Sequence, residues 1–407
     1  MKLLAILFTT QALLFASFSG TILDMNSSTP IKNTIVSDSF KDVRTDENGS
    51  FCIDTNETTL HVKAYGYRPL SFNTDDNITN IKVKAIKVKA LYLSFWHTSN
   101  NSSRLKDVLK VIDETEINAV VVDVKNEYGS TSFLTSFKQA NSYGAHKNRT
   151  NRDIGNFIQT MKDKNIYTIA RIVTFKDEIQ ASYNEDYAIK KEDGSIWRNH
   201  DNMAWVDPFD KRSHRYTIRI AEEAAKVGFD EINFDYIRFP AKDELVLSKK
   251  NTQKNRIKTI SSFLELAKKR LRKYGVFISV DTYGNVCWSK DDNGIGQTIE
   301  SLAKHADYLS PMLYPSGFAS GSFYFEYPAN HPYDVIYRSV KNIKDRIDTK
   351  RVRPWLQYFK DYGKNKKYYR KIEVNEQMRG ADDANTSGWM MWSPSSKYHK
   401  SYFKTKD

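Results

Sequence analysis

The chain has 407 residues, of which 40% are hydrophobic, and its 62 Lys and Arg against 49 Asp and Glu give a formal net charge of +13. This length suits one large core and a small second module, and two Cys residues exclude a disulfide framework and a zinc site. The positive charge suits an anionic polymer or a cell envelope as partner, but the lysines are scattered and no nucleic-acid-binding module is recognisable.

The first 20 residues, MKLLAILFTTQALLFASFSG, have the layout of a secretory signal peptide, with one Lys, an apolar run and small residues at the end. No later apolar run approaches the roughly 20 residues that cross a bilayer. We therefore expect an exported protein, periplasmic, cell-surface or secreted, without a stable transmembrane anchor. A retained N-terminal anchor is the alternative.

Residues 21–86 predict a small all-β sandwich, because short alternating segments are separated by turn residues and show no helical period. The succession GTILDMNSSTPIKNTIV, TDENGSFCID and LHVKAYGY resembles the carboxypeptidase regulatory-like domain. This resemblance implies a spacer or adhesion module without catalytic function.

Residues 87–407 alternate eight times between an apolar strand and a segment of helical period, which predicts an α/β fold, the (β/α)8 TIM barrel. Ser103 is the expected cap of the helix RLKDVLKVIDE, and a later helix, HRYTIRIAEEAAKVG, ends in Gly228. An open doubly wound sheet also alternates, but it often has a glycine-rich loop after its first strand, where this chain has FWHTSNNSS. The expected strands are 90–96, 119–124, 167–172, 231–237, 276–282, 308–314, 351–357 and 388–393.

The fourth expected strand carries acidic and amide side chains at alternating positions. Glu231, Asn233 and Asp235 share one face, because side chains alternate with a period of two. Ile232 and Phe234 suit the helix-facing side of the strand. The polar set is therefore expected to line the barrel lumen and its mouth, where the active sites of such barrels lie.

A carboxylate in this position needs a partner, and Arg238, Lys125 or Arg171 is the expected one. The fifth strand ends in SVDTYG, which places Asp281 beside Asp235. Cleavage of a glycosidic bond needs two carboxyl groups, one to protonate the departing oxygen and one to act as nucleophile or to activate water. Asp235 and Asp281 are the expected catalytic pair.

Further residues at the strand ends are expected to bind substrate. Sugars present apolar C–H faces to aromatic rings and hydroxyl groups to polar side chains, so a carbohydrate polymer or oligosaccharide is the expected partner. Trp389 and Trp392, three apart on one strand, cannot both face inward. The expected substrate-binding residues are Asp123, Glu127, Arg171, Asn233, Arg238, Tyr283, Trp96, His97, Tyr314, Trp355 and Trp392.

Other chemistries are less favoured. The eight His residues show no metal-ligand spacing, and the G-x-S-x-G motif of serine hydrolases is absent from the sequence. We therefore expect no metal and no cofactor.

Several linked motifs, in order, resemble the family of glycoside-hydrolase-type barrels that is catalogued as a domain of unknown function. They are NAVVVDVKNEYG, INFDYIRFP, SVDTYGNVCW, DDNGIGQTIESLAKHADYLSPMLYPSGF, NHPYDVIYRSV, RVRPWLQYF and SGWMMWSPSSKY, and they span about residues 88 to 400. The resemblance implies a glycosidase-superfamily barrel, with family-motif aspartates at Asp235, Asp281 and Asp123.

Two functions are compatible with these observations. The first is an exported glycoside hydrolase that cleaves a polysaccharide or cell-envelope glycan by paired-carboxylate catalysis. The second is a non-catalytic carbohydrate-binding or surface scaffold protein that has kept the barrel.

Overall fold

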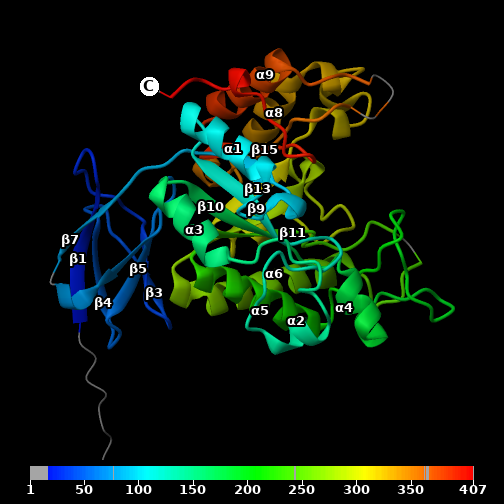
Figure 1. Ribbon diagram of the computed structural model, residues 1–407, viewed down its shortest axis with the longest axis horizontal. Helices are drawn as coiled ribbons and strands as arrows, with labels where there is room; N and C mark the ends of the chain where they lie inside the picture. The colour runs from blue at the N-terminus through cyan, green and yellow to red at the C-terminus, as the bar shows by residue number, and fades with distance from the viewer. Residues whose placement is uncertain (1–16, 77, 243, 362, 364–365, 407) are drawn as a thin grey trace, which may run out of the picture.

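The structure is a computed structural model that describes residues 17–76, 78–242, 244–361, 363 and 366–406. It consists of a small N-terminal β module and a closed barrel of eight strands (Figure 1). The predicted fold class is confirmed, with a (β/α)8 barrel preceded by a small module of β-strands.

The N-terminal module contains two sheets packed on an apolar core. One sheet has the order β4-β1-β7 and the other β3-β2-β5-β6, and all described pairs are antiparallel except β1 with β7. Ile22, Val36, Leu60 and Val62 are fully buried between them. The strands are β1 (Ser17–Asp24), β2 (Ile35–Ser37), β3 (Asp42–Arg44), β4 (Ser50–Asp54), β5 (Thr59–Lys63), β6 (Leu70–Asn73) and β7 (Asn80–Val83).

Most of the predicted signal peptide, residues 1–16, lies outside the described residues. Its last four residues, 17–20, form the first half of β1 and pair with β4, from Ser17 opposite Asp54 to Gly20 opposite Phe51. Cleavage after Gly20 would therefore remove half of a paired strand. Among the helices of the described residues, none has the length and apolar character needed to span a membrane.

The barrel strands are parallel and follow each other in chain order, and β15 closes the ring against β8. Strand β9, AVVVDVK, is buried along its whole length, as expected for a barrel strand covered on both faces. All eight strands overlap the predicted segments. They are β8 (Val88–Leu93), β9 (Ala119–Lys125), β10 (Tyr167–Val173), β11 (Glu231–Asp235), β12 (Phe277–Tyr283), β13 (Tyr308–Met312), β14 (Trp355–Gln357) and β15 (Gly388–Trp392).

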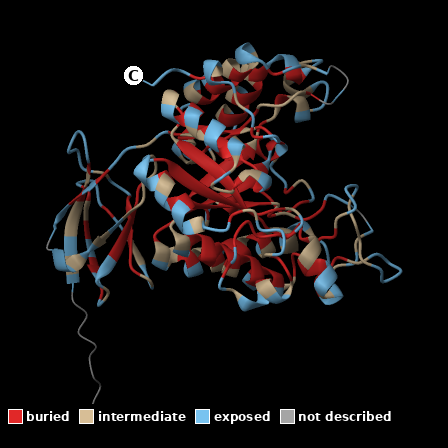
Figure 2. Cartoon of the chain, viewed as in Figure 1, coloured by how far each residue is buried: buried red, intermediate tan, exposed pale blue. Residues whose placement is uncertain are grey.

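Helices cover the outside of the barrel and turn their polar faces to solvent (Figure 2). The first begins after Ser102, whose side chain accepts from the Leu105 N–H, so the predicted cap is wrong by one residue. Gly228 ends α5 in the left-handed conformation, as predicted. The helices are α1 (Ser103–Glu114), α2 (Lys138–Ser142), α3 (Ile154–Asp163), α4 (Glu178–Tyr183), α5 (Lys211–Val227), α6 (Gln253–Leu271), α7 (Ile299–Ala303), α8 (Pro332–Lys341) and α9 (Lys371–Asp383).

The eightfold alternation predicted from the sequence is incomplete at its end. Strand β15 is followed by the short 3-10 helix Lys400–Tyr402 instead of an α-helix. The closing strand begins at Gly388, which has φ +110°, and a Cβ there would lie 1.8 Å from the Val88 carbonyl oxygen. The barrel closes at this point because glycine allows the two backbones to approach.

The N-terminal module packs against the floor of the barrel, the end where the strands begin. Nζ of Lys63 lies 2.8 Å from the Asp307 carboxylate in a buried ion pair. The ring of Tyr65 meets Tyr308 edge-on, at 5.8 Å between centroids, and belongs to the apolar cluster inside the barrel. Tyr65 therefore closes the barrel floor, and the opposite face, where the strands end, stays free.

Candidate active site

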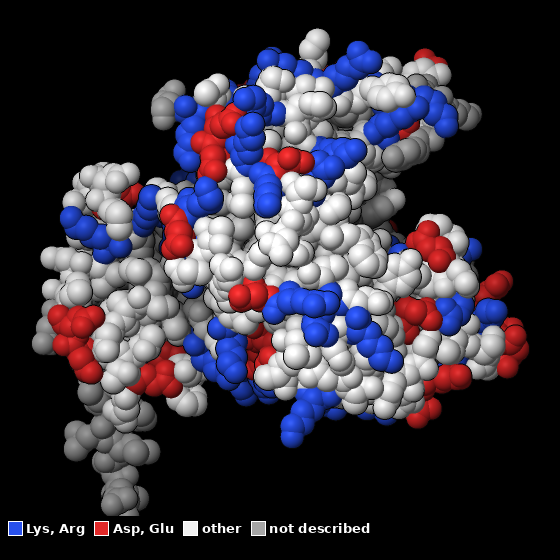
Figure 3. Space-filling view, viewed as in Figure 1, with Lys and Arg blue, Asp and Glu red and all other residues white. Residues whose placement is uncertain are grey.

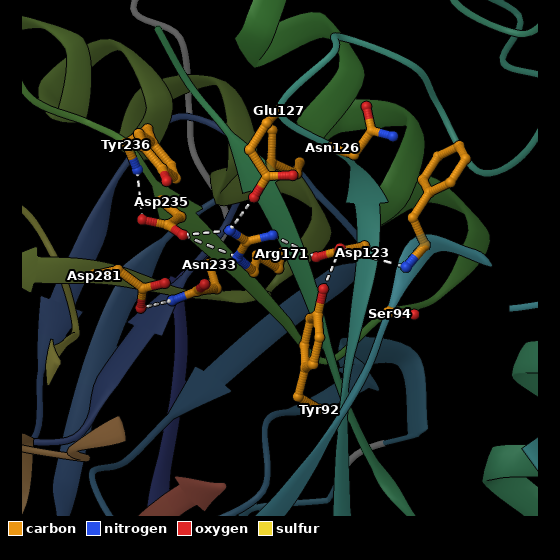
Figure 4. Close-up of polar contacts among 12 residues, drawn as sticks. Tyr92, Ser94, Asp123, Asn126, Glu127, Arg171, Asn233, Asp235, Tyr236 and Asp281 are labelled. Atoms are coloured by element: carbon orange, nitrogen blue, oxygen red, sulfur yellow. Dashed lines mark hydrogen bonds and ion pairs between the residues drawn. The ribbon is translucent and has the colours of Figure 1, made fainter. Parts of the chain in front are cut away.

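Arg171 forms the centre of a buried ion cluster at the C-terminal end of the barrel (Figure 4). It lies on β10, between β9 and β11, and its guanidinium donates to Asp123 at 2.6 Å, to Glu127 at 2.8 Å and to Asp235 at 2.9 and 2.5 Å. One cation thus holds three carboxylates. Of the three expected partners of Asp235, Arg171 is the one that makes the ion pair.

The three carboxylates differ in their surroundings. Burial raises the pKa of Asp123 to about 6, against the opposing effect of Arg171. The pKa of Glu127 is lowered, because Arg171 outweighs the effect of burial. For Asp235, the second oxygen accepts the Tyr236 backbone N–H at 2.6 Å, so donors to both oxygens stabilise its negative charge.

Aromatic rings cover one side of this cluster. The Tyr92 hydroxyl donates to Asp123 at 2.5 Å. Trp392 stacks on Tyr92 with 3.9 Å between centroids, and the Arg171 guanidinium lies 5.0 Å from the Trp392 ring. Trp389 is buried on the helix-facing side, so the two tryptophans face opposite ways, as predicted. Trp392 and Tyr92 hold the cluster in place by packing and hydrogen bonding.

Asp281 occupies a separate buried position on β12. The Asn233 amide and the Trp355 indole each donate to its Oδ1 at 2.8 Å. Asn233 lies opposite Ser279 in the β11 and β12 register, and Asp235 and Asp281 each lie two residues further along their strands. Burial and the negative charge of Asp235 hold the pKa of Asp281 well above its usual range. Asp281 is therefore a carboxyl group that holds its proton more strongly than usual, beside Asp235, which is paired with Arg171.

The inward orientation of the alternating positions on β11 agrees with the prediction, but the three residues occupy different depths. Glu231 lies near the floor, where Arg353 contacts it at 2.7 Å and the Tyr167 hydroxyl donates to it at 2.9 Å. Asn233 lies in the middle of the strand and Asp235 at the C-terminal end. Glu231 is fully buried and part of the core. Of these three side chains, only that of Asp235 lies at the mouth of the barrel.

Lys125 and Trp355 have positions that strand alternation did not reveal. A β-bulge in β9 sets Ile172 opposite Lys125, and Lys125 pairs with Asp177 at 2.8 Å instead of joining Asp123. Trp355 is only 1% exposed and packs in the apolar cluster inside the barrel, and substrate binding by this residue stays a prediction. It positions Asp281 through its indole N–H.

The remaining expected residues surround the mouth. Tyr283, 46% exposed, and Tyr314 line a hollow of about 120 Å³ beyond β12 and β13. Burial, followed by the charges of Asp281 and Asp235, raises the pKa of Tyr314, so its hydroxyl stays a donor near the pair. Trp96, 61% exposed, and the half-buried His97 follow β8 in a 3-10 helix and make no described contact with the Arg171 cluster.

Arg238 lines a larger hollow of about 550 Å³ on the other side of Asp235. The two hollows therefore flank the ends of β11 and β12. Asp235 and Asp281 line neither of them, and Tyr236, the residue after Asp235, forms part of the wall of the larger one. Within the described part of the chain, no three His, Cys, Asp or Glu side chains are placed to hold a metal ion.

Three residues of this centre were missed by sequence reasoning: Tyr92, Ser279 and Arg353. Ser279 accepts from Asn233 at 3.0 Å, and the other two make the contacts described above. Arg353 precedes its strand, and the residue that it meets is 122 positions away. The period of a strand predicts the face of a side chain, but it does not identify its partner across the barrel.

The fold is a closed (β/α)8 barrel with ion-paired carboxylates at the C-terminal ends of its strands. The barrel is similar to the glycoside hydrolase domain of PgaB (BpsB) from Bordetella bronchiseptica, with a TM-score of 0.53 and 12% identity over 76% of this chain and 94% of that one. The sequence pattern of the family described as "Putative glycosyl hydrolase domain" matches residues 90–398. The chain belongs to this family.

Two other solved structures are similar to this chain. A hypothetical protein from Ruminiclostridium thermocellum ATCC 27405 is 35% identical over 47% of this chain and 96% of that one, with a TM-score of 0.42. The spore cortex-lytic enzyme SleL of Bacillus megaterium QM B1551 is 11% identical over 77% of this chain and 72% of that one, with a TM-score of 0.47. No curated protein matches the sequence.

Proposed function

We propose that the protein is a glycoside hydrolase in which Asp281 is the general acid and Asp235 the second carboxylate. One observation carries this proposal: Asp281 is a buried carboxyl group whose pKa is raised, and it lies next to Asp235, which is paired with Arg171. Both N–H donors to Asp281 bind Oδ1, so its proton belongs on Oδ2. Pairs of carboxyl groups whose surroundings separate their pKa values are typical of acid and base assignments.

In the proposed reaction, Asp281 gives its proton to the glycosidic oxygen as the bond to the anomeric carbon breaks. Asp235 faces the positive charge that develops on the sugar and either bonds to the anomeric carbon or activates the water that does. Water finally supplies the hydroxyl group on the anomeric carbon. If Asp235 has bonded to that carbon, the proton of the water returns to Asp281; if Asp235 activates the water, it takes that proton, and exchange with solvent restores both carboxyl groups. Arg171 is a positioning residue in this scheme, because its ion pair with Asp235 fixes the orientation of that carboxylate.

The test is the release of new reducing ends from cell-wall and exopolysaccharide preparations. We expect Asp281→Asn and Asp235→Asn to lower the rate by about 10² to 10⁴, the usual contribution of such a group. Asp193→Asn is the control, because Asp193 lies in an exposed turn and bonds only to Ser195. Glycan binding and thermal stability should persist in both site variants.

A wild type that binds these glycans but releases no reducing ends would contradict hydrolysis. That result would favour the second function, a non-catalytic carbohydrate-binding barrel. Export through the N-terminal segment, and the similarity of residues 21–86 to the carboxypeptidase regulatory-like domain, remain part of the proposal and rest on the sequence.

A further inference from the structure

The larger hollow beside Asp235 has a strongly cationic lining. It lies among the loops after β10 and β11, which extend from the barrel at the right of Figure 1. Four Lys or Arg side chains and one carboxylate, Asp201, line it together with three aromatic rings. The cations are Lys176, Arg198, Arg238 and Lys242, and the rings are those of Trp197, Trp205 and Tyr236.

Two of these cations already have acidic partners. Nζ of Lys176 lies 3.0 Å from Asp201, and Arg198 lies 2.6 Å from Glu178. Arg238 differs from both, because it makes no ion pair with any described residue. Its one hydrogen bond is to the carbonyl of the next residue, Phe239, at 3.2 Å. The guanidinium thus keeps most of its donors for a ligand.

Arg238 is also held in place. Its guanidinium lies 5.1 Å from the ring of Trp205 and 5.3 Å from that of Tyr236. These two rings meet edge-on at 5.6 Å and restrict the arginine on two sides. A fixed planar guanidinium fits a carboxylate or phosphate through two parallel hydrogen bonds.

On the face of the barrel that Figure 3 shows, Lys and Arg side chains are spread out and lie among Asp and Glu side chains. The unpaired, ring-held arginine in the hollow is therefore a local feature. The volume of about 550 Å³ is in the range of small-molecule sites, about 300 to 1,000 Å³, and can take a sugar unit.

We infer that this hollow is a subsite for an anionic sugar, and that Arg238 binds the acidic group of that sugar. The inference rests on the proposed glycan substrate and specifies its class: a polymer with carboxylate-bearing or phosphate-bearing units. The half-buried Trp197 provides the apolar wall of the subsite. A unit bound here lies next to Tyr236 and so adjoins the bond presented to Asp235.

The test measures binding by calorimetry to the Asp281→Asn protein, in which turnover is suppressed. The probes are tetragalacturonate, its neutral methyl ester and phosphopentamannose. We expect at least one anionic probe to bind. If tetragalacturonate binds, its methyl ester should bind at least about tenfold more weakly. The comparison of the two anionic probes identifies the acidic group.

Substitution of Arg238 tests the assignment of the residue. Arg238→Gln should weaken the anionic probe at least about tenfold, and Arg238→Lys should restore part of the affinity because it keeps the charge without the planar fork. Arg338→Gln is the control, since Arg338 is exposed on α8 and pairs with Asp334. Melting temperatures show whether each variant is folded.

The inference is overturned if neither anionic probe binds, or if tetragalacturonate binds and its methyl ester binds equally well. It is also overturned if a folded Arg238→Gln protein binds the anionic probe with unchanged affinity. Failure of the hydrolase proposal looks different, because the wild type would then bind anionic probes through Arg238 without releasing reducing ends from any glycan.

Discussion

Asn233 donates a hydrogen bond of 2.8 Å to Oδ1 of Asp281 on the neighbouring strand. Trp355 donates to the same oxygen from β14, so two fixed donors meet one atom of the carboxyl group. The two oxygens of Asp281 therefore have different surroundings. This relationship gives a buried acid a defined orientation.

Asp281 should lower the stability of the protein at neutral pH. Its folded pKa lies well above the value of the unfolded chain, because of burial and the charge of Asp235. The stability contribution of such a group is complete below about pH 4, and it is lost as pH rises through the folded pKa. Asp281→Asn stays neutral throughout and should become more stable than the wild type as pH rises from 4 to 7. Thermal melts at several pH values measure this, and a constant difference between the proteins would contradict it.

Trp355→Phe should shift the pH dependence of activity upward. The indole N–H stabilises the charged form of Asp281, so its removal raises the pKa further. Activity that depends on protonated Asp281 should then persist to higher pH, as seen on the alkaline side of a kcat/KM profile. Trp389→Phe is the matched control, because Trp389 is equally buried but packs on the helix-facing side. Similar profiles for both variants would refute the assigned role.

Arg171→Met should destabilise the protein by about 3 to 5 kcal/mol at pH 7, as expected when a buried cation is removed and its partners stay charged. Asp123 and Glu127 would then have higher folded pKa values and would take up protons more easily. The loss should therefore be smaller at pH 5 than at pH 7 in urea unfolding. Arg212→Met removes the partly exposed Asp210 pair and should cost less than about 1 kcal/mol.

Gly388→Ala should disrupt closure of the barrel. The new Cβ would lie 1.8 Å from the Val88 carbonyl oxygen, so β15 and β8 would have to separate. We expect a loss above about 4 kcal/mol, the exceptional range for one substitution, or no folded protein. Gly194→Ala is the control: Gly194 also has positive φ, +80°, but has open space around it, and should cost about 1 to 2 kcal/mol. Equal losses would mean that φ, and not the clash, determines the effect.

The barrel was predictable because its strands are buried on both faces and therefore read as short apolar runs. The run AVVVDVK became β9 nearly as expected. The C-terminal end was less predictable, since residues 394–406 have neither the apolar period nor the length of a helix and form only a 3-10 turn. The repeated strand and helix pattern predicted the barrel, but it did not predict the irregular C-terminal end.

The candidate site was predictable by face but not by contact. Alternation placed Asn233 and Asp235 inward, and both lie there. The sequence also left Lys125 as a candidate partner of Asp235, but Lys125 follows the β-bulge in β9 and pairs with Asp177. The sequence placed Trp355 among the substrate-binding residues. Its burial could not be predicted, because burial depends on neighbours from other strands. Partners across a lumen depend on the closure of the barrel, which no local pattern encodes.

The position of Tyr65 has a geometric consequence. Because the N-terminal module seals the end where the strands begin, it lies on the opposite side of the barrel from Asp235 and Asp281. If the outer side of this module were attached to a surface, the mouth of the barrel would point away from that surface. In that arrangement the substrate proposed above would have to approach the barrel from the side opposite the module.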